Sequence, residues 1–240
     1  MKVQKLALKV SLMAATVGFL FAGNAMAAVT NGSFSQGLTG WSTLGDVVVQ
    51  SGSILMTTAS TLYEDDFPEA AGTFNASGNA AADIAAGGFE AFAGLSAGAL
   101  DTPDFAYEGS ILKQTFNVNA GDTLSFNWNF FTNETNAGSD YAFISVNGVL
   151  TKLASASNAT IASVPYALST GAGLFSQTFA AASSITLAFG VVDLTDYNAT
   201  SALWLDNVNL VAAPVPEPES YAMLLAGLGL IAVASRRKKS

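Results

Sequence analysis

Hydrophobic and polar residues alternate along residues 123–132, which indicates a β-strand with one apolar face. The apolar positions on that face are Leu124, Phe126, Trp128 and Phe130. Successive side chains of a strand point to opposite faces, so these four side chains must face a core. Their burial is worth on the order of 6–12 kcal/mol before conformational entropy is deducted. Residues 111–118 alternate in the same way and predict a second long strand.

Further alternating runs are separated by glycine, asparagine, aspartate and serine. They predict strands at residues 47–50, 53–57, 140–149, 150–153, 173–180, 184–192 and 201–211. Ser51 with Gly52 and Asn147 with Gly148 predict tight hairpin turns. Many short strands with regular turn signals predict an all-β sandwich or barrel. We expect one exported domain over residues 28–214, which is long enough for a single core.

Residues 58–102 differ in composition and predict a partly helical insertion that lies across the sandwich. They are rich in alanine and glycine, and residues 80–86 and 89–95 predict short helical turns. Glycines beside these turns limit their length. The acidic run at residues 64–66 is typical of a solvated loop.

The N-terminus has the three parts of a secretory signal peptide, which we expect to occupy residues 1–27. Lysines at positions 2, 5 and 9 are followed by an apolar, helix-compatible run over residues 10–22. Ala25 and Ala27 form a small-x-small cleavage site, so Ala28 is the expected new N-terminus. The alternative, an N-terminal membrane anchor, would need a longer apolar run.

The C-terminal residues 215–240 also have three parts. Two prolines hold the first part extended, and it consists of Val215, Pro216, Glu217 and Pro218. Residues 221–234 are apolar and predict a transmembrane helix over residues 220–235, although 14 helical residues reach only about 21 Å of the roughly 30 Å of a hydrocarbon core. A basic cluster stops transfer on the cytoplasmic side and consists of Arg236, Arg237, Lys238 and Lys239. We therefore expect a marginal span suited to temporary retention.

This tail resembles the PEP-CTERM sorting signal of Gram-negative bacteria, which is also labelled an ice-binding protein C-terminal domain without implying ice binding. The resemblance implies that the secretion machinery exports the chain and retains it transiently at the inner membrane. It further implies that an exosortase, a membrane-embedded cysteine protease, cuts near the Pro-Glu-Pro element and passes the chain to the cell surface or extracellular matrix. Proteins with this tail are associated with extracellular polysaccharide and biofilm. An ordinary C-terminal membrane anchor is the alternative.

The charge and composition of the expected domain exclude several functions. Between residues 28 and 214 there are two basic and sixteen acidic residues, so the net charge is −14. Such a domain is unsuited to nucleic acid, because phosphate contacts need lysine and arginine, but it is compatible with divalent cations and neutral sugars. The chain has no cysteine and no histidine, which excludes disulfides, Ser-His triads and histidine-rich zinc sites.

Residues 31–34, together with Gly37 and Trp41, resemble the opening of jelly-roll carbohydrate-binding modules. The resemblance implies a jelly-roll-like β-sandwich. In those modules an acidic residue follows the phenylalanine and ligates a structural calcium, but here that position is Ser35. Trp41 is expected to be a core residue that closes one end of the sandwich, and a sugar platform is the alternative. Residues 106–210 also resemble a group of PEP-CTERM proteins, which supports the sandwich and implies no activity.

Two acidic loops, residues 132–140 and 193–198, predict a structural calcium site at one end of the sandwich, because calcium prefers carboxylate, amide and carbonyl oxygens. The candidate ligands are Glu134, Asp140, Asp193, Asp196 and Asn198. The alternative is that these residues stabilise turns without a metal.

Sugar binding requires exposed aromatic rings beside polar groups. The candidates in or near loops are Tyr63, Phe67, Tyr107, Tyr166, Tyr197 and Trp204, and the alternative for Trp204 is inward packing. A glycosidase would use two carboxylates about 5–10 Å apart, but nothing in the sequence marks such a pair, so we expect no catalytic residue. We expect a non-enzymatic surface protein that associates with polysaccharide or acts in adhesion. A structural matrix component and a secreted polysaccharide-active enzyme are the alternatives.

Overall fold

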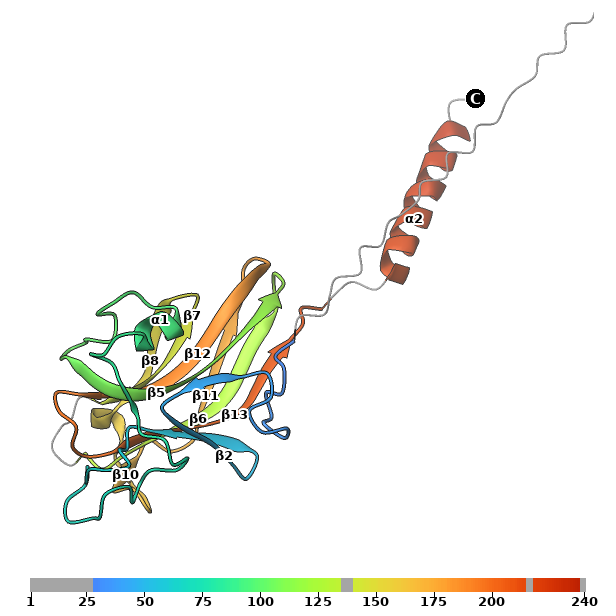
Figure 1. The fold of residues 1–240 in the computed structure, drawn as a ribbon. Helices are drawn as coiled ribbons and strands as arrows, with labels where there is room; N and C mark the ends of the chain where they lie inside the picture. Colours follow the sequence, from blue (N-terminus) through green and yellow to red (C-terminus); the bar gives the residue numbers. More distant parts are fainter. Residues whose placement is uncertain (1–27, 135–139, 215–217, 238–240) are drawn as a thin grey trace, which may run out of the picture.

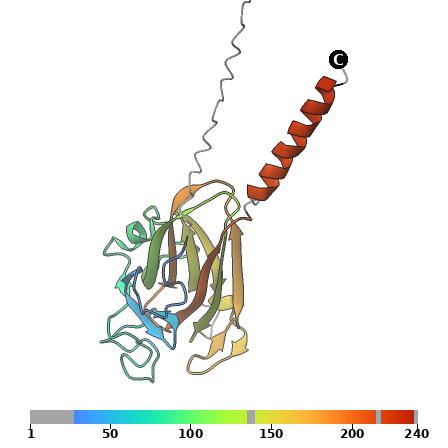
Figure 2. The same ribbon diagram turned by 90° about the vertical axis from the view of Figure 1, so that its right-hand side faces the viewer.

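The protein is described by a computed structural model that covers residues 28–134, 140–214 and 218–237. Two antiparallel sheets pack face to face, so the predicted β-sandwich is confirmed (Figure 1; Figure 2). The predicted signal peptide, with Ala25 and Ala27, lies outside the described residues, which begin at Ala28.

The six-stranded sheet has the order β1-β5-β12-β7-β8, with β4 paired to β5. Its strands are β1 Ser42–Leu44, β4 Ala82–Asp83, β5 Ala106–Val118, β7 Tyr141–Val146, β8 Val149–Ser155 and β12 Ser183–Leu194. Its longest pairing joins β5 to β12, so these two strands form the middle of the sheet.

The seven-stranded sheet has the order β2-β3-β13-β6-β10-β9, with β11 paired to β6. Its strands are β2 Asp46–Gln50, β3 Ser53–Thr57, β6 Thr123–Thr132, β9 Ile161–Ala162, β10 Leu168–Ser169, β11 Gly173–Thr178 and β13 Ser201–Val211. A short 3₁₀ helix, Ala156–Asn158, follows β8.

Hydrophobic alternation located most strands correctly. The predicted strands at 123–132 and 201–211 are β6 and β13, with the same bounds. Both predicted hairpin turns form, and their residues have the positive φ angles that such turns require: Ser51 (54°), Gly52 (83°), Asn147 (50°) and Gly148 (77°). The strand predicted at 111–118 instead begins at Ala106, because β12 pairs with residues 106–110 as well.

The main core lies between the sheets. Leu124, Phe126 and Phe130 of β6 are buried there, as predicted, and Trp128 is half-buried. Trp41 is a core residue, since it is buried and its ring centroid lies 5.5 Å from that of Phe34. This confirms the core prediction for Trp41 and leaves it unavailable as a sugar platform.

A second core lies on the outer face of the six-stranded sheet, under the second half of the insertion. The short helix α1 (Phe89–Ala93) falls inside the helical turn predicted at 89–95 and buries Phe89 against this face. The helical turn predicted at 80–86 is wrong, because Ala82–Asp83 forms β4. Backbone bonds to the sheet, such as Ile84 N–H to the Tyr107 carbonyl (2.8 Å), outweigh the helix propensity of the alanines.

Helix α2 (Pro218–Arg237) stands away from the sandwich in both ribbon views (Figure 1; Figure 2). Within residues 28–134, 140–214 and 218–237, no helix combines the length and hydropathy that a membrane crossing needs. The helix predicted at 220–235 is therefore confirmed as a helix but not as a membrane span. Its uncharged apolar run, residues 221–234, supplies only about 21 Å and is followed by arginine.

Candidate functional site

Three carboxylates lie in a row across adjacent strands at one end of the six-stranded sheet. Glu108 of β5 and Asp193 of β12 are direct register partners. Asp140 directly precedes β7, whose first residue pairs with the neighbour of Asp193, so the row continues onto a third strand. Alternation along these strands turns all three side chains inward, toward the space between the sheets. We call these three residues the carboxylate row.

The three side chains of the carboxylate row are buried, but not all of their oxygens have hydrogen-bond partners. Asp140 accepts hydrogen bonds from the Leu194 N–H (3.0 Å) and the Ser201 hydroxyl (2.7 Å). Asp193 is only 1% exposed, and its Oδ1 has no hydrogen-bond partner. Glu108 is 7% exposed, and its Oε1 also has no partner. An unpaired oxygen on a buried carboxylate is energetically costly, so these two atoms need an explanation.

Burial and mutual repulsion disfavour the charged forms of the row. Burial is the largest cause and the negative charge of Asp65 the next, and together they raise the pKa of Glu108 to about 8. Burial raises the pKa of Asp140 to about 7, although its two hydrogen bonds act in the opposite direction. Burial and the charges of Asp140 and Glu108 raise the pKa of Asp193 most strongly. The row therefore holds negative charge poorly unless a positive partner is present.

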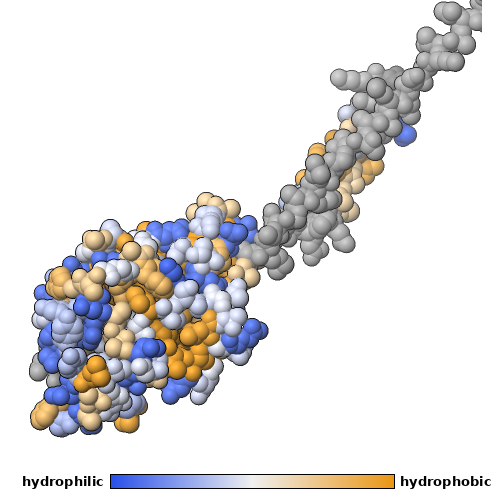
Figure 3. Space-filling model, in the orientation of Figure 1, coloured by the Kyte–Doolittle hydropathy of each residue, from blue (hydrophilic) through white to orange (hydrophobic). Residues whose placement is uncertain are grey.

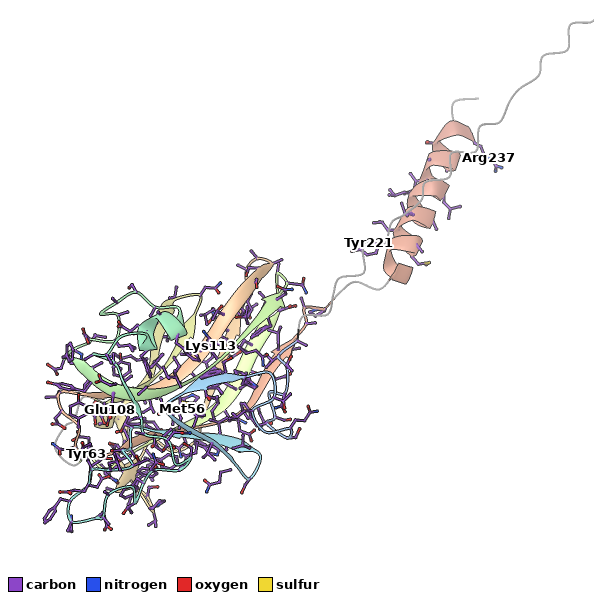
Figure 4. The ribbon with its side chains drawn as sticks, in the orientation of Figure 1. Met56, Tyr63, Glu108, Lys113, Tyr221 and Arg237 are labelled. Carbon is purple, nitrogen blue, oxygen red and sulfur yellow. The ribbon has the colours of Figure 1, made fainter. Side chains whose placement is uncertain are left out.

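The two lysines of the domain lie on the other side of this sheet. The Lys113 ammonium lies 3.9 Å from the centre of the Phe92 ring, and the Lys152 ammonium lies 3.9 Å from the centre of the Tyr141 ring. Lys152 also donates to the Thr102 carbonyl. Both lysines thus lie on the outer face, beside the second half of the insertion. Figure 4 places Glu108 at the end of the sandwich remote from α2, and Lys113 farther along β5.

The predicted calcium ligands fall at this same end, although they do not form a ready ligand shell. Glu134 and Asp196 are close enough to the row to raise the pKa of Asp193, and Asn198 lines a pocket with Glu108. Among residues 28–134, 140–214 and 218–237, no three Asp, Glu, His or Cys side chains are arranged to hold a metal ion. The sequence prediction missed Glu108. Alternation could have located it, because the inward-facing residues of β5 have even numbers and Glu108 follows the same alternation.

A second site is an aromatic groove on the outer face of the seven-stranded sheet, with a volume of about 620 Å³. Trp204 of β13 lies in its floor, because its neighbours Leu203 and Leu205 point into the core. The groove is completed by Leu55 of β3, Phe131 of β6, Phe74 of the insertion and Tyr166 of the segment before β10. We call these five side chains, Trp204 included, the aromatic groove.

The rings of the aromatic groove support one another. Tyr166 stacks on Phe131 with a centroid distance of 5.5 Å, and the ring centroids of Phe74 and Tyr166 lie 5.2 Å apart. Polar side chains line the same groove, namely Gln50, Glu69, Thr73 and Asn75. A neighbouring hollow of about 680 Å³ shares Phe74 and Tyr166 and extends to Phe67 and Asp66. The two hollows also share Glu69 and Pro165, so they adjoin each other.

The predicted sugar-binding aromatics divide between the two sites. Tyr166 and Trp204 line the aromatic groove and Phe67 lines its extension, so the inward packing considered for Trp204 is wrong. Tyr63 and Tyr197 line the pocket at Glu108, and Tyr107 packs edge-on against Tyr197. The sequence prediction missed Phe74 and Phe131. Phe131 belongs to the outward face of β6, where its neighbours Asn127 and Asn129 are polar.

The tail is a separate site. Pro218 is the first residue of α2, a position that suits proline because a helix leaves its first N–H groups unpaired. Along the helix the large apolar side chains are exposed, for example Leu224 (61%) and Leu230 (73%), and some are visible in Figure 3. Arg237 is exposed at the far end (Figure 4). The sorting residues Val215, Pro216 and Glu217, and the basic residues Lys238 and Lys239, lie outside the described residues.

A family model described as the PEP-CTERM protein-sorting motif matches residues 214–238. The chain therefore carries the sorting motif that its tail predicts, which supports processing by an exosortase. The motif covers about a tenth of the chain and marks it for export and sorting to the cell surface. No curated protein matches the chain.

Proposed function

We propose that this exosortase substrate delivers to the cell surface a β-sandwich that binds extracellular polysaccharide and catalyses no reaction. The aromatic groove is the observation that carries the proposal. Flat rings such as Trp204 and Phe131 offer large, rigid faces for stacking, and the polar rim offers hydrogen bonds for hydroxyl groups. The groove adjoins a second hollow that shares Phe74 and Tyr166, and two adjoining hollows suit a chain better than a small molecule.

The charge distribution favours a polymer without acidic groups. The charged residues that line the groove and its extension are Glu69, Asp65 and Asp66, and no lysine or arginine lines either hollow. A neutral glycan avoids repulsion from these carboxylates, whereas a uronic-acid polymer does not.

Binding is tested by retarded migration of the purified full chain in gels that contain a neutral polysaccharide. We expect Trp204→Ala to weaken binding at least about tenfold, which corresponds to roughly 1.4 kcal/mol. Phe105→Ala is the matched control, because Phe105 is a half-exposed ring that does not line the groove. Equal retardation of the Trp204 variant and the unaltered chain would show that the groove is not the binding site. The absence of retardation by any polysaccharide would contradict the binding function itself.

The routing part of the proposal concerns the tail. The secretion machinery exports the chain, and α2 with its basic end keeps it at the inner membrane of a Gram-negative cell only until cleavage. The exosortase cuts near Pro216, Glu217 and Pro218, and the sandwich then joins the cell surface or the extracellular matrix. The exposed apolar side chains of α2 support a membrane-associated intermediate.

A second candidate function, polysaccharide hydrolysis, is favoured by one observation. Glu108 and Asp65 line the same pocket of about 470 Å³, and burial raises the pKa of both carboxyl groups. A protonated carboxylic acid beside a second carboxylate is the arrangement of a glycosidase. Release of reducing ends from a bound polymer, abolished by Glu108→Gln, would establish hydrolysis. Binding without any release of reducing ends supports the non-enzymatic function.

A further inference from the structure

The unpaired buried polar atoms gather at a single end of the sandwich. Among the described residues these atoms are Asp66 Oδ2, Glu108 Oε1, Asn133 Nδ2, Asp193 Oδ1 and Thr200 Oγ1. Thr200 donates its N–H to Asp66, and the next residue, Ser201, donates its hydroxyl to Asp140. The contacts therefore place this group beside the carboxylate row.

Four of these five atoms are oxygens, and two of them belong to the directly paired carboxylates Glu108 and Asp193. Side chains on one face of directly opposed residues have Cβ atoms about 4.5–5.5 Å apart. Two carboxylates at that separation repel each other strongly in a buried position. Both lysines of the domain lie on the opposite face of this sheet, so neither of them neutralises the two carboxylates.

We propose that Glu108 and Asp193 form the anionic core of a calcium site at this end of the sandwich. An oxygen-rich environment selects a hard cation, and the absence of histidine and cysteine removes the ligands that favour zinc. Calcium accepts two carboxylates with neutral oxygens and water in an irregular shell, whereas magnesium requires a nearly regular octahedron. Glu108 lines the pocket at this end, which gives the ion a route from solvent.

Two carboxylates rather than three make up the proposed core. Both carboxylate oxygens of Asp140 accept hydrogen bonds, one from the Leu194 N–H and one from the Ser201 hydroxyl. We therefore assign Asp140 no direct bond to the ion. This agrees with the finding that no three acidic side chains among the described residues converge as metal ligands. A site of this kind binds with a Kd of about 10⁻⁴–10⁻³ M, as extracellular calcium modules do.

The first test follows the thermal unfolding of the purified full chain near pH 7.5, in chelator and in calcium. At about twenty times Kd, we expect calcium to raise Tm by about 4–7 °C and magnesium to raise it by less than half as much. Equal Tm values in chelator and in calcium would overturn the proposal.

The second test uses the double variant Glu108→Gln with Asp193→Asn. It removes the buried repulsion, so we expect its metal-free Tm to equal or exceed that of the unaltered chain, with no response to calcium. A purely structural role for the two carboxylates would instead lower the metal-free Tm. Asp206→Asn is the matched control and should keep the calcium response, because the Asp206 carboxylate bonds only to its neighbour Asn207 in the described contacts. A double variant that still responds to calcium would overturn the site.

A third measurement applies to the unaltered chain and does not depend on any variant folding. Tyr63 and Tyr197 line the pocket with Glu108, so a terbium ion bound there should emit when tyrosine is excited. We expect this emission, and we expect calcium to suppress it. The absence of tyrosine-sensitised terbium emission would count against the site.

Discussion

Two buried aspartates, Asp46 and Asp193, have opposite surroundings. Asp46 accepts hydrogen bonds from the Thr57 hydroxyl (2.5 Å), the Ala76 N–H (2.9 Å) and the Ser77 N–H (2.6 Å). Asp193 has an oxygen with no partner. The sequence shows both as single aspartates beside a β-strand, and only the three-dimensional contacts distinguish a structural carboxylate from an unsatisfied one.

We predict that Asp46→Ala lowers the free energy of unfolding by about 2–4 kcal/mol, because it leaves three donors without an acceptor in a buried position. Denaturant unfolding of the full chain measures the change. Since two of the donors belong to the insertion, limited proteolysis should also cut near Ala76 and Ser77 sooner than in the unaltered chain. Asp206→Ala serves as the control, and similar losses of stability in the two variants would contradict the role of Asp46.

At the same scale, the carboxylate row predicts how the stability of the calcium-free protein depends on pH. Its native pKa values lie above those of the unfolded chain, with Glu108 at about 8 and Asp140 at about 7. The native state therefore binds more protons than the unfolded state between about pH 4 and pH 8. The Tm in chelator should fall by several degrees as the pH rises from about 5 to 8. A Tm that rises over this range would contradict the buried row.

At the scale of the element, the close pairing of β12 with β7 depends on a glycine. Gly190 lies directly opposite Phe143, and a Cβ at position 190 would be 2.5 Å from the Phe143 ring. We predict that Gly190→Ala lowers the free energy of unfolding by about 1–3 kcal/mol, because Phe143 must leave its position in the second core. Gly227→Ala in α2 is the matched control, since a Cβ there meets nothing within 4 Å. An unchanged Tm in the Gly190 variant would contradict this packing.

Element prediction succeeded where burial on one face decides the pattern. Residues 123–130 alternate between polar and apolar side chains, and β6 has the predicted bounds. The prediction failed at residues 80–86, where pairing to the edge of a sheet overrides a local preference for helix. The aromatic groove was largely out of reach, because Phe74, Phe131, Tyr166 and Trp204 belong to four distant segments that only the fold brings together.

At the scale of the whole molecule, the chain combines a sandwich with a separate tail that determines its routing. The motif at residues 214–238 lies entirely beyond β13, so cleavage between them removes no strand of either sheet. We therefore expect the processed sandwich to keep the Tm of the full chain within about 2 °C, since it keeps both cores. A much lower Tm after processing would show that the tail stabilises the sandwich.

The most direct test of the account is mass spectrometry of the C-terminus of this protein, taken from the surface-exposed pool of intact cells. Processing by an exosortase predicts a C-terminus near Pro216, Glu217 and Pro218, with helix α2 and its basic end absent. A surface pool that still ends in Arg236, Arg237 and the following lysines would contradict the account.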